Sequence, residues 1–305
     1  MTPSIETSRE RLAGLLAAQA RQDGFSDSPL PGVRYARAVG HYPLAPALYE
    51  PSVVILATGR KRAVVGGAVH SLDPGCCWVV AVPLAFACET FATADAPLYG
   101  LSVRVDPAVL GELLLEMDDA PGEAAATPSE AADAVGLRAM PMTRHLADAA
   151  ARLAECLGAP DEARILGPGI VREIVFRVLR SGQGPTLRAL AAQSGRLRAV
   201  SRALKRIHAD FRDELDVESL AREAHMGLST FHHAFRAVTA TTPLQYVKAV
   251  RLHKARALLA EPGATAAEAA RRVGYASPSQ FSREYKRLFG APPSEEIARL
   301  RGATG

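Results

Sequence analysis

The chain has 305 residues, of which 48% are hydrophobic and 22% charged, so it is long enough for two domains with separate cores. No stretch approaches the roughly 18 apolar residues of a membrane span, and the charged, amphipathic start does not resemble a secretory signal. Four Cys without Cys-x-x-Cys or Cys/His spacing argue against a disulfide scaffold and a metal module. We therefore expect a soluble, reduced, cytoplasmic protein without cofactor.

The charge is distributed unevenly along the chain. Residues 196–305 contain 19 Lys and Arg against 11 Asp and Glu, a net charge of +8, whereas the residues before them have a net charge of −4. A basic segment beside an acidic one is typical of a phosphate-binding domain joined to a domain that does not bind phosphate. The asymmetry thus favours a nucleic-acid partner for the C-terminal third.

The first half of the chain changes from helical to strand-like. Residues 4–22 have apolar positions at helical spacing, and short β-branched runs begin at Gly32. These runs are Gly32–Tyr35, Ser52–Ala57, Ala63–Val65, Trp78–Val82 and Leu98–Val105. Turn signals such as Gly66-Gly67 separate them, a spacing that predicts a sandwich or small barrel. Residues 60–80 have the pattern of the start of a jelly-roll cupin.

The pattern becomes helical again after Asp106-Pro107. We expect helices at 109–117, 142–157 and 164–179, with an Ala-, Gly- and Pro-rich excursion at 120–136. The run 181–185 contains Gly and Pro and ends the last of these helices. The predicted domains are therefore 1–195 and 196–305.

One short pattern occurs twice near the C-terminus, at 220–235 and 269–285. Each copy has a small-residue helix, a tight turn and a polar helix with two large apolar residues four positions apart. Such a pair lies on one face of a helix, so the polar residues between them point outward. This arrangement is typical of a helix-turn-helix DNA reader, and its repetition makes the signal specific.

Capping signals define the helices between and within the two copies. Thr242 to Gln245, Thr265 to Glu268 and Ser277 to Gln280 each read as a capping box that begins a helix. The first begins a helix over 243–259, which Glu261-Pro262-Gly263 ends. A helix of that length spans about 25 Å. It could place two recognition helices in successive major-groove segments, about 34 Å apart.

Residues 200–297 resemble the DNA-binding domain of AraC-type (AraC/XylS) bacterial transcription regulators. The resemblance rests on the stretch 230–259, TFHHAFRAVTATTPLQYVKAVRLHKARALL, and on 269–295, AARRVGYASPSQFSREYKRLFGAPPSE. Ala240 departs from the family, which often has Gly at this helix end, and some strain is expected there. Glu296-Ile297 also departs, where the family more often has Tyr-Arg. The resemblance implies a regulator that binds double-stranded promoter DNA and is not an enzyme.

Residues 25–180 resemble, more loosely, the cupin-like N-terminal domain of one AraC-type subgroup. The matching motifs are Leu48-Tyr-Glu-Pro51, Gly59-Arg-Lys61, Asp73-Pro-Gly75 and Val103-Arg-Val-Asp-Pro107. The resemblance implies a small-molecule effector or dimerisation for this domain, and contact with RNA polymerase if the protein is an activator. The expected fold class is α+β, with an N-terminal cupin-like β-barrel with helices and a C-terminal all-α double helix-turn-helix domain.

Nine side chains are candidates for contact with DNA. On the recognition helices expected at 229–239 and 279–289, the outward residues are Ser229, His232, His233, Arg236, Ser279, Ser282, Arg283, Lys286 and Arg287. Arg283 is the strongest candidate for a base contact, because guanidinium pairs bidentately with guanine O6 and N7. Arg236, Lys286 and Arg287 are phosphate candidates. For each of them a solvated helix face is the alternative.

The N-terminal domain offers three further hypotheses. Aromatic side chains that could line an effector pocket, or simply form the core, are Tyr35, Tyr42, Trp78, Phe86 and Phe91. Alternation places Trp78 and Val80 on one face. The adjacent Cys76 and Cys77 could sense oxidants or electrophiles, or be buried small apolar residues. A metal-dependent cupin enzyme fused to a DNA reader is disfavoured, because the cupin His-x-His signature is absent.

Overall fold

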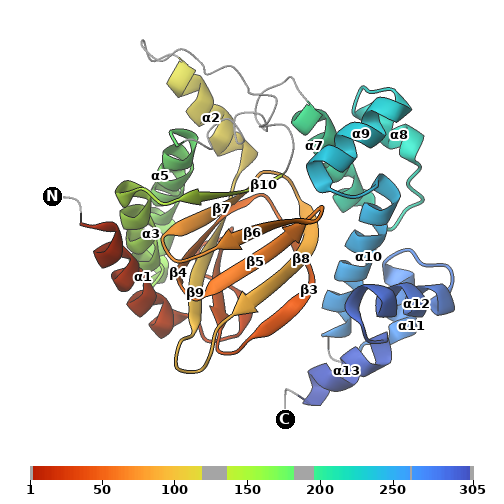
Figure 1. The fold of residues 1–305 in the computed structure, drawn as a ribbon, viewed down its shortest axis with the longest axis horizontal. Helices are drawn as coiled ribbons and strands as arrows, with labels where there is room; N and C mark the ends of the chain where they lie inside the picture. Colours follow the sequence, from red (N-terminus) through yellow and green to blue (C-terminus); the bar gives the residue numbers. More distant parts are fainter. Residues whose placement is uncertain (1–2, 119–135, 182–195, 262, 303–305) are drawn as a thin grey trace.

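The computed structural model describes residues 3–118, 136–181, 196–261 and 263–302, which form a β-rich N-terminal part and a helical C-terminal part (Figure 1). The strands are β1 (Gly24–Asp27), β2 (Val33–Ala38), β3 (Tyr42–Tyr49), β4 (Ser52–Thr58), β5 (Arg60–Val65), β6 (Ala68–Leu72), β7 (Cys76–Val80), β8 (Leu84–Phe91), β9 (Leu98–Arg104) and β10 (Leu137–Pro141). The N-terminal helices are α1 (Ile5–Gln19), α2 (Pro107–Asp118), α3 (Arg144–Cys156), α4 (Pro160–Ile165) and α5 (Gly167–Leu179).

The strands form two antiparallel sheets. The six-stranded sheet has the order β1-β2-β9-β4-β7-β10, and the four-stranded sheet has the order β3-β8-β5-β6. β4 lies inside the larger sheet, and its first six residues are buried. Both faces of this strand are apolar because one face meets the other sheet and the other face meets helices. Along β5, exposed and buried residues alternate, as expected for a strand with one face in solvent and the other in the core.

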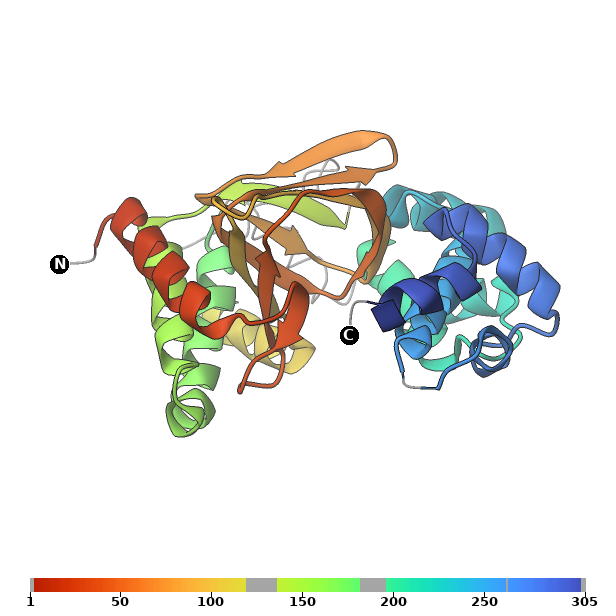
Figure 2. The same ribbon diagram turned by 90° about the horizontal axis from the view of Figure 1, so that it is seen from below.

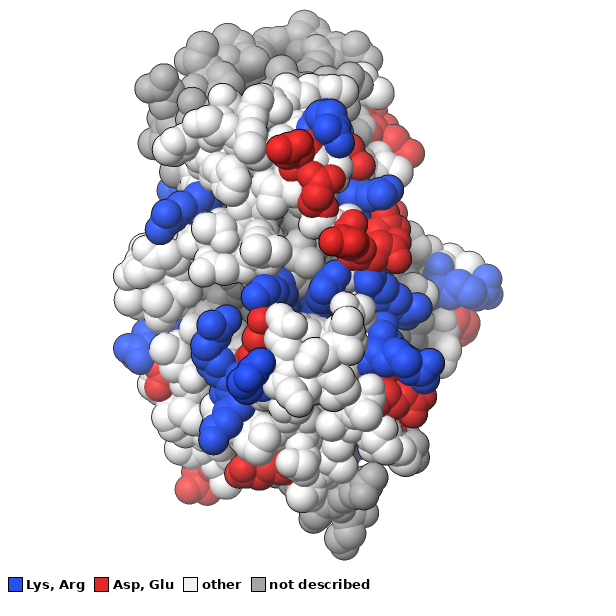
Figure 3. Space-filling view, turned by 90° about the vertical axis from the view of Figure 1, so that its right-hand side faces the viewer, with Lys and Arg blue, Asp and Glu red and all other residues white. Residues whose placement is uncertain are grey.

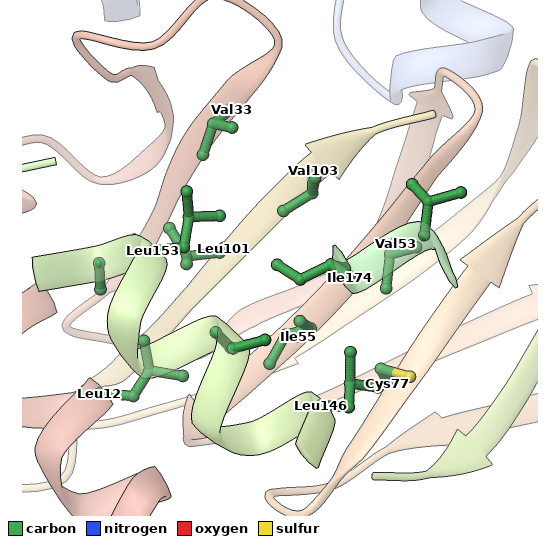
Figure 4. Packing of buried hydrophobic residues seen from close by; sticks show 14 of the residues in the cluster. Leu12, Val33, Val53, Ile55, Cys77, Leu101, Val103, Leu146, Leu153 and Ile174 are labelled. Carbon is green, nitrogen blue, oxygen red and sulfur yellow. The ribbon is translucent and has the colours of Figure 1, made fainter. Parts of the chain in front are cut away.

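A separate core lies on each face of the six-stranded sheet. Between the sheets, Trp78 and Val80 are fully buried, as the alternation predicts. On the other face, helices α1, α3 and α5 pack against the sheet and bury Cys77 and Val79. Figure 4 shows Leu12, Leu146, Leu153 and Ile174 of these helices directed at Val53, Ile55 and Leu101. Figure 2 shows the helices on the side of the sheets away from the C-terminal part.

The C-terminal part contains the repeated helical pattern expected from the sequence. Its helices are α7 (Arg196–Asp210), α8 (Val217–Glu223), α9 (Leu228–Thr239), α10 (Pro243–Leu259), α11 (Ala266–Arg272), α12 (Pro278–Phe289) and α13 (Pro293–Gly302). The predicted N-caps of these three helices are confirmed: the hydroxyls of Thr242, Thr265 and Ser277 accept the backbone N–H three residues on. Of the helices that the structure describes, none has the length and apolar character needed to cross a bilayer.

Each helix-turn-helix unit has its own core, and α10 contributes to both. Phe231 and Phe235 of α9 are fully buried in the first, together with Val250 of α10. Phe281 and Tyr285 of α12 are fully buried in the second, together with Ala255 of α10. The predicted apolar pairs are therefore confirmed, and so is the two-domain α+β fold class.

Several expectations about local structure are wrong. The helix expected over 164–179 is two helices, because Gly167-Pro168 begins a new one. A Cβ on Gly167 would lie 2.6 Å from Leu30. The break between the two helices therefore lies where the backbone packs closely against the Leu30 side chain. Strands β1, β3, β8 and β10 were not expected from the sequence. The excursion expected at 120–136 lies almost wholly outside the described residues.

Helix α9 ends at Ala240 in the left-handed backbone conformation that is expected where the family often has Gly. Ala240 adopts the left-handed conformation, with φ 59° and ψ 13°, and its N–H donates to the carbonyl of Arg236. We expect Ala240→Gly to raise the free energy of unfolding by about 0.5–1 kcal/mol, because glycine adopts this conformation without steric cost.

Ala237→Gly provides a matched control in the same helix. Ala237 is exposed, and glycine there should lower stability by about 1 kcal/mol. Calorimetric thermal unfolding of both variants checks the prediction. A loss of stability in Ala240→Gly would show instead that contacts of the Ala240 methyl group outweigh the backbone strain.

Candidate nucleic-acid interface

α9 presents a polar face to solvent. Ser229, His232, His233 and Arg236 are exposed, and the large apolar residues between them are buried. The helix begins after Gly227, without a side-chain cap. Its four outward side chains include donors, acceptors and one fixed positive charge, the chemistry that reads base edges and phosphates.

α12 repeats this arrangement fifty residues later. Ser279, Arg283, Lys286 and Arg287 are exposed, and Ser282 is half-buried. Ser277 caps the helix and Pro278 occupies its first turn, so the start of the helix is fixed by local sequence. The positive charges lie in the later turns of the helix, where they can reach phosphates beside a groove.

Both recognition helices lie on the near side of the C-terminal part in Figure 1, with α9 above α12. They are joined by α10, a continuous helix of 17 residues. Lys and Arg side chains gather across the middle of the outer face of this region, and acidic side chains lie mainly above and below them (Figure 3). A basic band of this kind attracts the phosphate backbone of a nucleic acid.

A polar network that was not expected from the sequence holds α12 against α10. Glu284 Oε1 accepts a hydrogen bond from Lys248 Nζ at 2.7 Å, and Glu284 Oε2 accepts one from the Tyr275 hydroxyl at 2.7 Å. Gln280 Nε2 donates to the same carboxylate. Burial raises the pKa of Glu284, but these hydrogen bonds outweigh it and leave the pKa below its ordinary value. The carboxylate therefore stays charged and fixes the orientation of the second recognition helix.

The first helix-turn-helix unit is bound to the barrel by buried hydrogen bonds. The hydroxyl of Tyr246, on α10, donates to the carbonyl of Pro83 at 2.8 Å and lies 2.9 Å from His208 Nε2. Tyr246 has one hydroxyl hydrogen, so His208 Nε2 must be the donor to it. His208 Nδ1 lies 3.7 Å from Glu50, which precedes β4.

Backbone and apolar contacts extend this junction. The N–H of Gly136 donates to the carbonyl of Val238 in α9, at 3.1 Å. Ala81 and Val82, which follow β7, are buried in the same core as Phe231. At the tip of the β5–β6 hairpin, a Cβ on Gly66 would lie 2.8 Å from the Cβ of Ala240. The barrel thus contacts α9 near its C-terminal end, away from the outward residues of its first turns.

The second unit meets the barrel across a cleft of about 420 Å³. Arg287, Glu284 and Leu288 of α12 line one side of it, and Phe86 and Ala87 of β8 line the other. Arg287, expected to contact phosphate, therefore also faces the N-terminal domain.

The five aromatic residues proposed for an effector pocket do not lie together. Trp78 and Phe86 are part of one aromatic cluster between the sheets, with centroids 6.3 Å apart. Tyr35 faces the helices, where its hydroxyl donates to Gln19. Tyr42 is exposed and donates to Asp23, and Phe91 lies beside His41 at the far end of the barrel.

The cysteines proposed as sensors lie on β7, in environments that disfavour the thiolate. Cys77 is fully buried, and burial raises its pKa to about 12. Burial and the nearby Asp73 carboxylate also raise the pKa of Cys76, which is half-buried. In the part of the chain that the structure describes, no three His, Cys, Asp or Glu side chains gather as a metal site requires.

The fold and these surfaces define a two-domain protein with a β-barrel and a paired helix-turn-helix unit. Comparison with known families agrees with this class. Residues 29–186 match the model of the AraC-type transcriptional regulator N-terminus, and residues 220–299 match a helix-turn-helix domain model. The first match covers more than half of the chain. The protein therefore belongs to the AraC-type transcriptional regulators.

Individual relatives match only part of the chain. The chain is 40% identical over 85 residues to the RCS-specific activator RclR of Escherichia coli, covering 28% of this chain and 30% of that protein. It is 29% identical over 124 residues to the regulator ExsA of Pseudomonas aeruginosa, covering 41% of this chain and 44% of that one. The chain thus aligns with less than half the length of these relatives. These relatives are transcription regulators, not enzymes.

A solved structure has a similar fold over nearly the whole chain. Unsaturated fatty acid-bound ToxT of Vibrio cholerae has a TM-score of 0.59 and 11% sequence identity, over 92% of this chain and 98% of that one. At this identity the likeness shows the fold alone.

The junction at His208 predicts a pH-dependent stability. Burial lowers the pKa of His208, Lys254 acts in the same direction, and Glu50 opposes them. A lowered folded-state pKa means that the stabilisation is complete above the unfolded value of about 6.5 and is lost as pH falls through the folded value. We expect the melting temperature to fall between pH 7.5 and pH 5.

His208→Gln is the control for this prediction, because the amide can still donate to Tyr246 but does not titrate. The variant should show a smaller drop in melting temperature over the same range, since both proteins share the remaining histidines. Identical pH profiles for the two proteins would mean that protonation of His208 does not affect the junction.

Proposed function

We propose that this protein is a sequence-specific transcription regulator that binds double-stranded promoter DNA and responds to a small-molecule effector in its N-terminal domain. The observation that carries the DNA-binding part is the repeated unit of a buried apolar pair and an exposed polar face, on α9 and on α12. The two units are joined by one rigid helix and accompanied by a basic surface (Figure 3). Membership in the AraC-type family supports the same function.

In this mechanism α9 and α12 enter successive segments of the major groove on one face of the DNA. Arg283 pairs with a guanine through two hydrogen bonds, and Ser229, His232, His233, Ser279 and Ser282 make the remaining contacts to base edges. Arg236, Lys286 and Arg287 neutralise phosphates, which makes the affinity depend on salt. Glu284 has a positioning role, because the hydrogen bond that it accepts from Lys248 holds α12 relative to α10.

Control by an effector follows from the junction between the domains. Because the barrel shares a core with the first unit, an effector that favours one arrangement of the barrel changes the position of α9 relative to α12. The effector would act through this junction, or through assembly of two copies of the chain on DNA. Contact with RNA polymerase belongs to the proposal if the regulator is an activator.

Covalent sensing through Cys76 and Cys77 is the second candidate for the input. The adjacent thiols on β7 motivate it, but their raised pKa values leave little thiolate at neutral pH. Reversible binding of an effector is therefore the favoured form of control.

For DNA recognition, we expect Arg283→Ala to lose about 1–3 kcal/mol of binding free energy at one base position, because a bidentate contact to guanine is lost. Selection of bound fragments from a random DNA pool, for wild type and variant, measures this. The wild-type motif should contain two boxes one helical turn apart. The motif of the variant should lose its base preference at a single position.

Lys286→Ala is the matched control on the same helix. It should weaken binding to all sequences alike and reduce the salt dependence by about one phosphate contact. If Arg283→Ala produces that uniform loss instead, Arg283 contacts phosphate and not a base. If no sequence is enriched with or without candidate effectors, the proposed function is wrong.

For the thiols, we expect N-ethylmaleimide at pH 7.5 to modify Cys77 at least about a hundredfold more slowly in the folded protein than in urea, because only the thiolate reacts. Peptide mass spectrometry gives the rate for each cysteine, and DNA affinity is measured on the modified protein. Rapid labelling of Cys76 or Cys77 with loss of DNA binding would favour the covalent sensor.

A further inference from the structure

A cleft of about 920 Å³ opens at the end of the barrel opposite the C-terminal domain. One wall is α1, which presents Ala13, Gly14 and Ala17. The other walls are the β4–β5 turn and the segment that follows β8. In Figure 1, α1 flanks the barrel on the side away from α7–α13. None of the residues expected from the sequence to bind an effector lies here except Phe91.

The lining has the composition of a small-molecule site. Most of it is apolar, contributed by Ala, Pro, Phe and Tyr side chains, and the polar groups include His41, Arg60 and Asp95. Small-molecule sites typically have volumes of about 300–1,000 Å³, apolar walls and a few polar groups. A Cβ on Gly14 would meet nothing within 4 Å, so no other part of the described chain fills the space over α1.

Phe91 is held in place at the mouth of this cleft. Its ring is 36% exposed and is stacked on His41, with centroids 5.3 Å apart and planes 28° from parallel. His41 Nε2 lies 2.9 Å from Glu89 Oε1, and Arg62 pairs with the same carboxylate and lies over the Phe91 ring. Glu89 is itself buried. The two rings are therefore held as a preorganised stack at the edge of an apolar space, and an aromatic ring can pack against the free face or the edges of this stack.

The positive charge at the rim is compensated. Arg60 forms an ion pair with Asp73, and Asp95 adds a negative charge nearby. An anionic ligand would therefore be disfavoured at this rim, whereas a single hydroxyl or similar group can bond to His41. The stacked rings favour a planar aromatic body over an aliphatic one.

We propose that this cleft binds a small aromatic compound with one polar substituent and no negative charge, and that this compound is the effector. That the bound compound is the effector rests on the proposed function. The site lies at one end of strands whose other end reaches the junction: β8 starts beside Pro83, which accepts the hydrogen bond from Tyr246, and ends at Phe91. β4 likewise runs from the residues next to Glu50 to Thr58 in the cleft.

The binding experiment uses the full chain, and its probe is N-phenyl-1-naphthylamine, an uncharged dye that fluoresces in apolar surroundings. We expect saturable binding at one site, weakened about tenfold or more by Ala17→Phe, because the new ring fills the cleft. Ala18→Phe is the matched control: Ala18 is also exposed on α1 but does not line the cleft. It should bind the dye like the wild type.

Displacement of the dye tests the chemical class. We expect 2-naphthol to displace it at a concentration about three- to tenfold lower than decahydro-2-naphthol, its saturated counterpart, because only the aromatic compound stacks. Circular dichroism and melting temperature show whether each variant is folded. If Ala17→Phe does not fold, Gly14→Leu is the second variant that fills the cleft.

Two results would overturn the proposal: no saturable binding to the folded wild type, or equal binding by Ala17→Phe and Ala18→Phe. Equal displacement by the two alcohols would overturn the aromatic class. Because none of these measurements involves DNA, their failure is distinguishable from a failure of the proposed DNA-binding function, which the fragment selection tests separately.

Discussion

The buried hydroxyl of Tyr246 determines how the two domains are related. It is fully buried on α10 and hydrogen-bonded both to the carbonyl of Pro83 in the barrel and to His208 on α7. Removing a partner from such a buried group would leave it unsatisfied, at a cost of about 1–3 kcal/mol. Because α10 also contributes to both helix-turn-helix cores, the position of the barrel and the separation of the recognition helices depend on the same helix.

The two helix-turn-helix units are consequently not equivalent. The first shares a core with Ala81 and Val82, so it and the barrel move together. The second has a core of its own and meets the barrel across a cleft, and the Glu284 network attaches it to α10. A rearrangement of the N-terminal domain would therefore displace α9 directly and α12 only through α10. This asymmetry follows from packing, since the sequences of the two units follow the same pattern.

Local sequence predicted the C-terminal domain well because four of its described helices begin at side-chain caps and its recognition helices bury large aromatic residues at fixed spacing. It predicted the barrel less well. β3 contains two Ala and two Pro, and β8 contains two Ala, residues with low strand propensity. β8 pairs with β3 on one side and with β5 on the other. The prolines of β3 are tolerated because that strand lies at a sheet edge. The junction could not be predicted at all: Tyr246 and Pro83 are 163 positions apart, and only the fold brings them together.

Separation along the chain also explains why the sequence did not show that the five aromatic residues proposed for an effector pocket lie apart. The sequence identifies aromatic side chains but not which face of a sheet each occupies, and Tyr35, Trp78 and Phe91 lie in three different environments. Those that pack between the sheets or against helices are occupied in stabilising the fold. Phe91 differs because Glu89, two residues before it, orients His41 and Arg62 around its ring. A buried ion pair usually stabilises a fold no more than apolar residues of similar size would. The buried carboxylate of Glu89 is therefore better explained by the two basic side chains that it positions at the cleft than by the stability of the core.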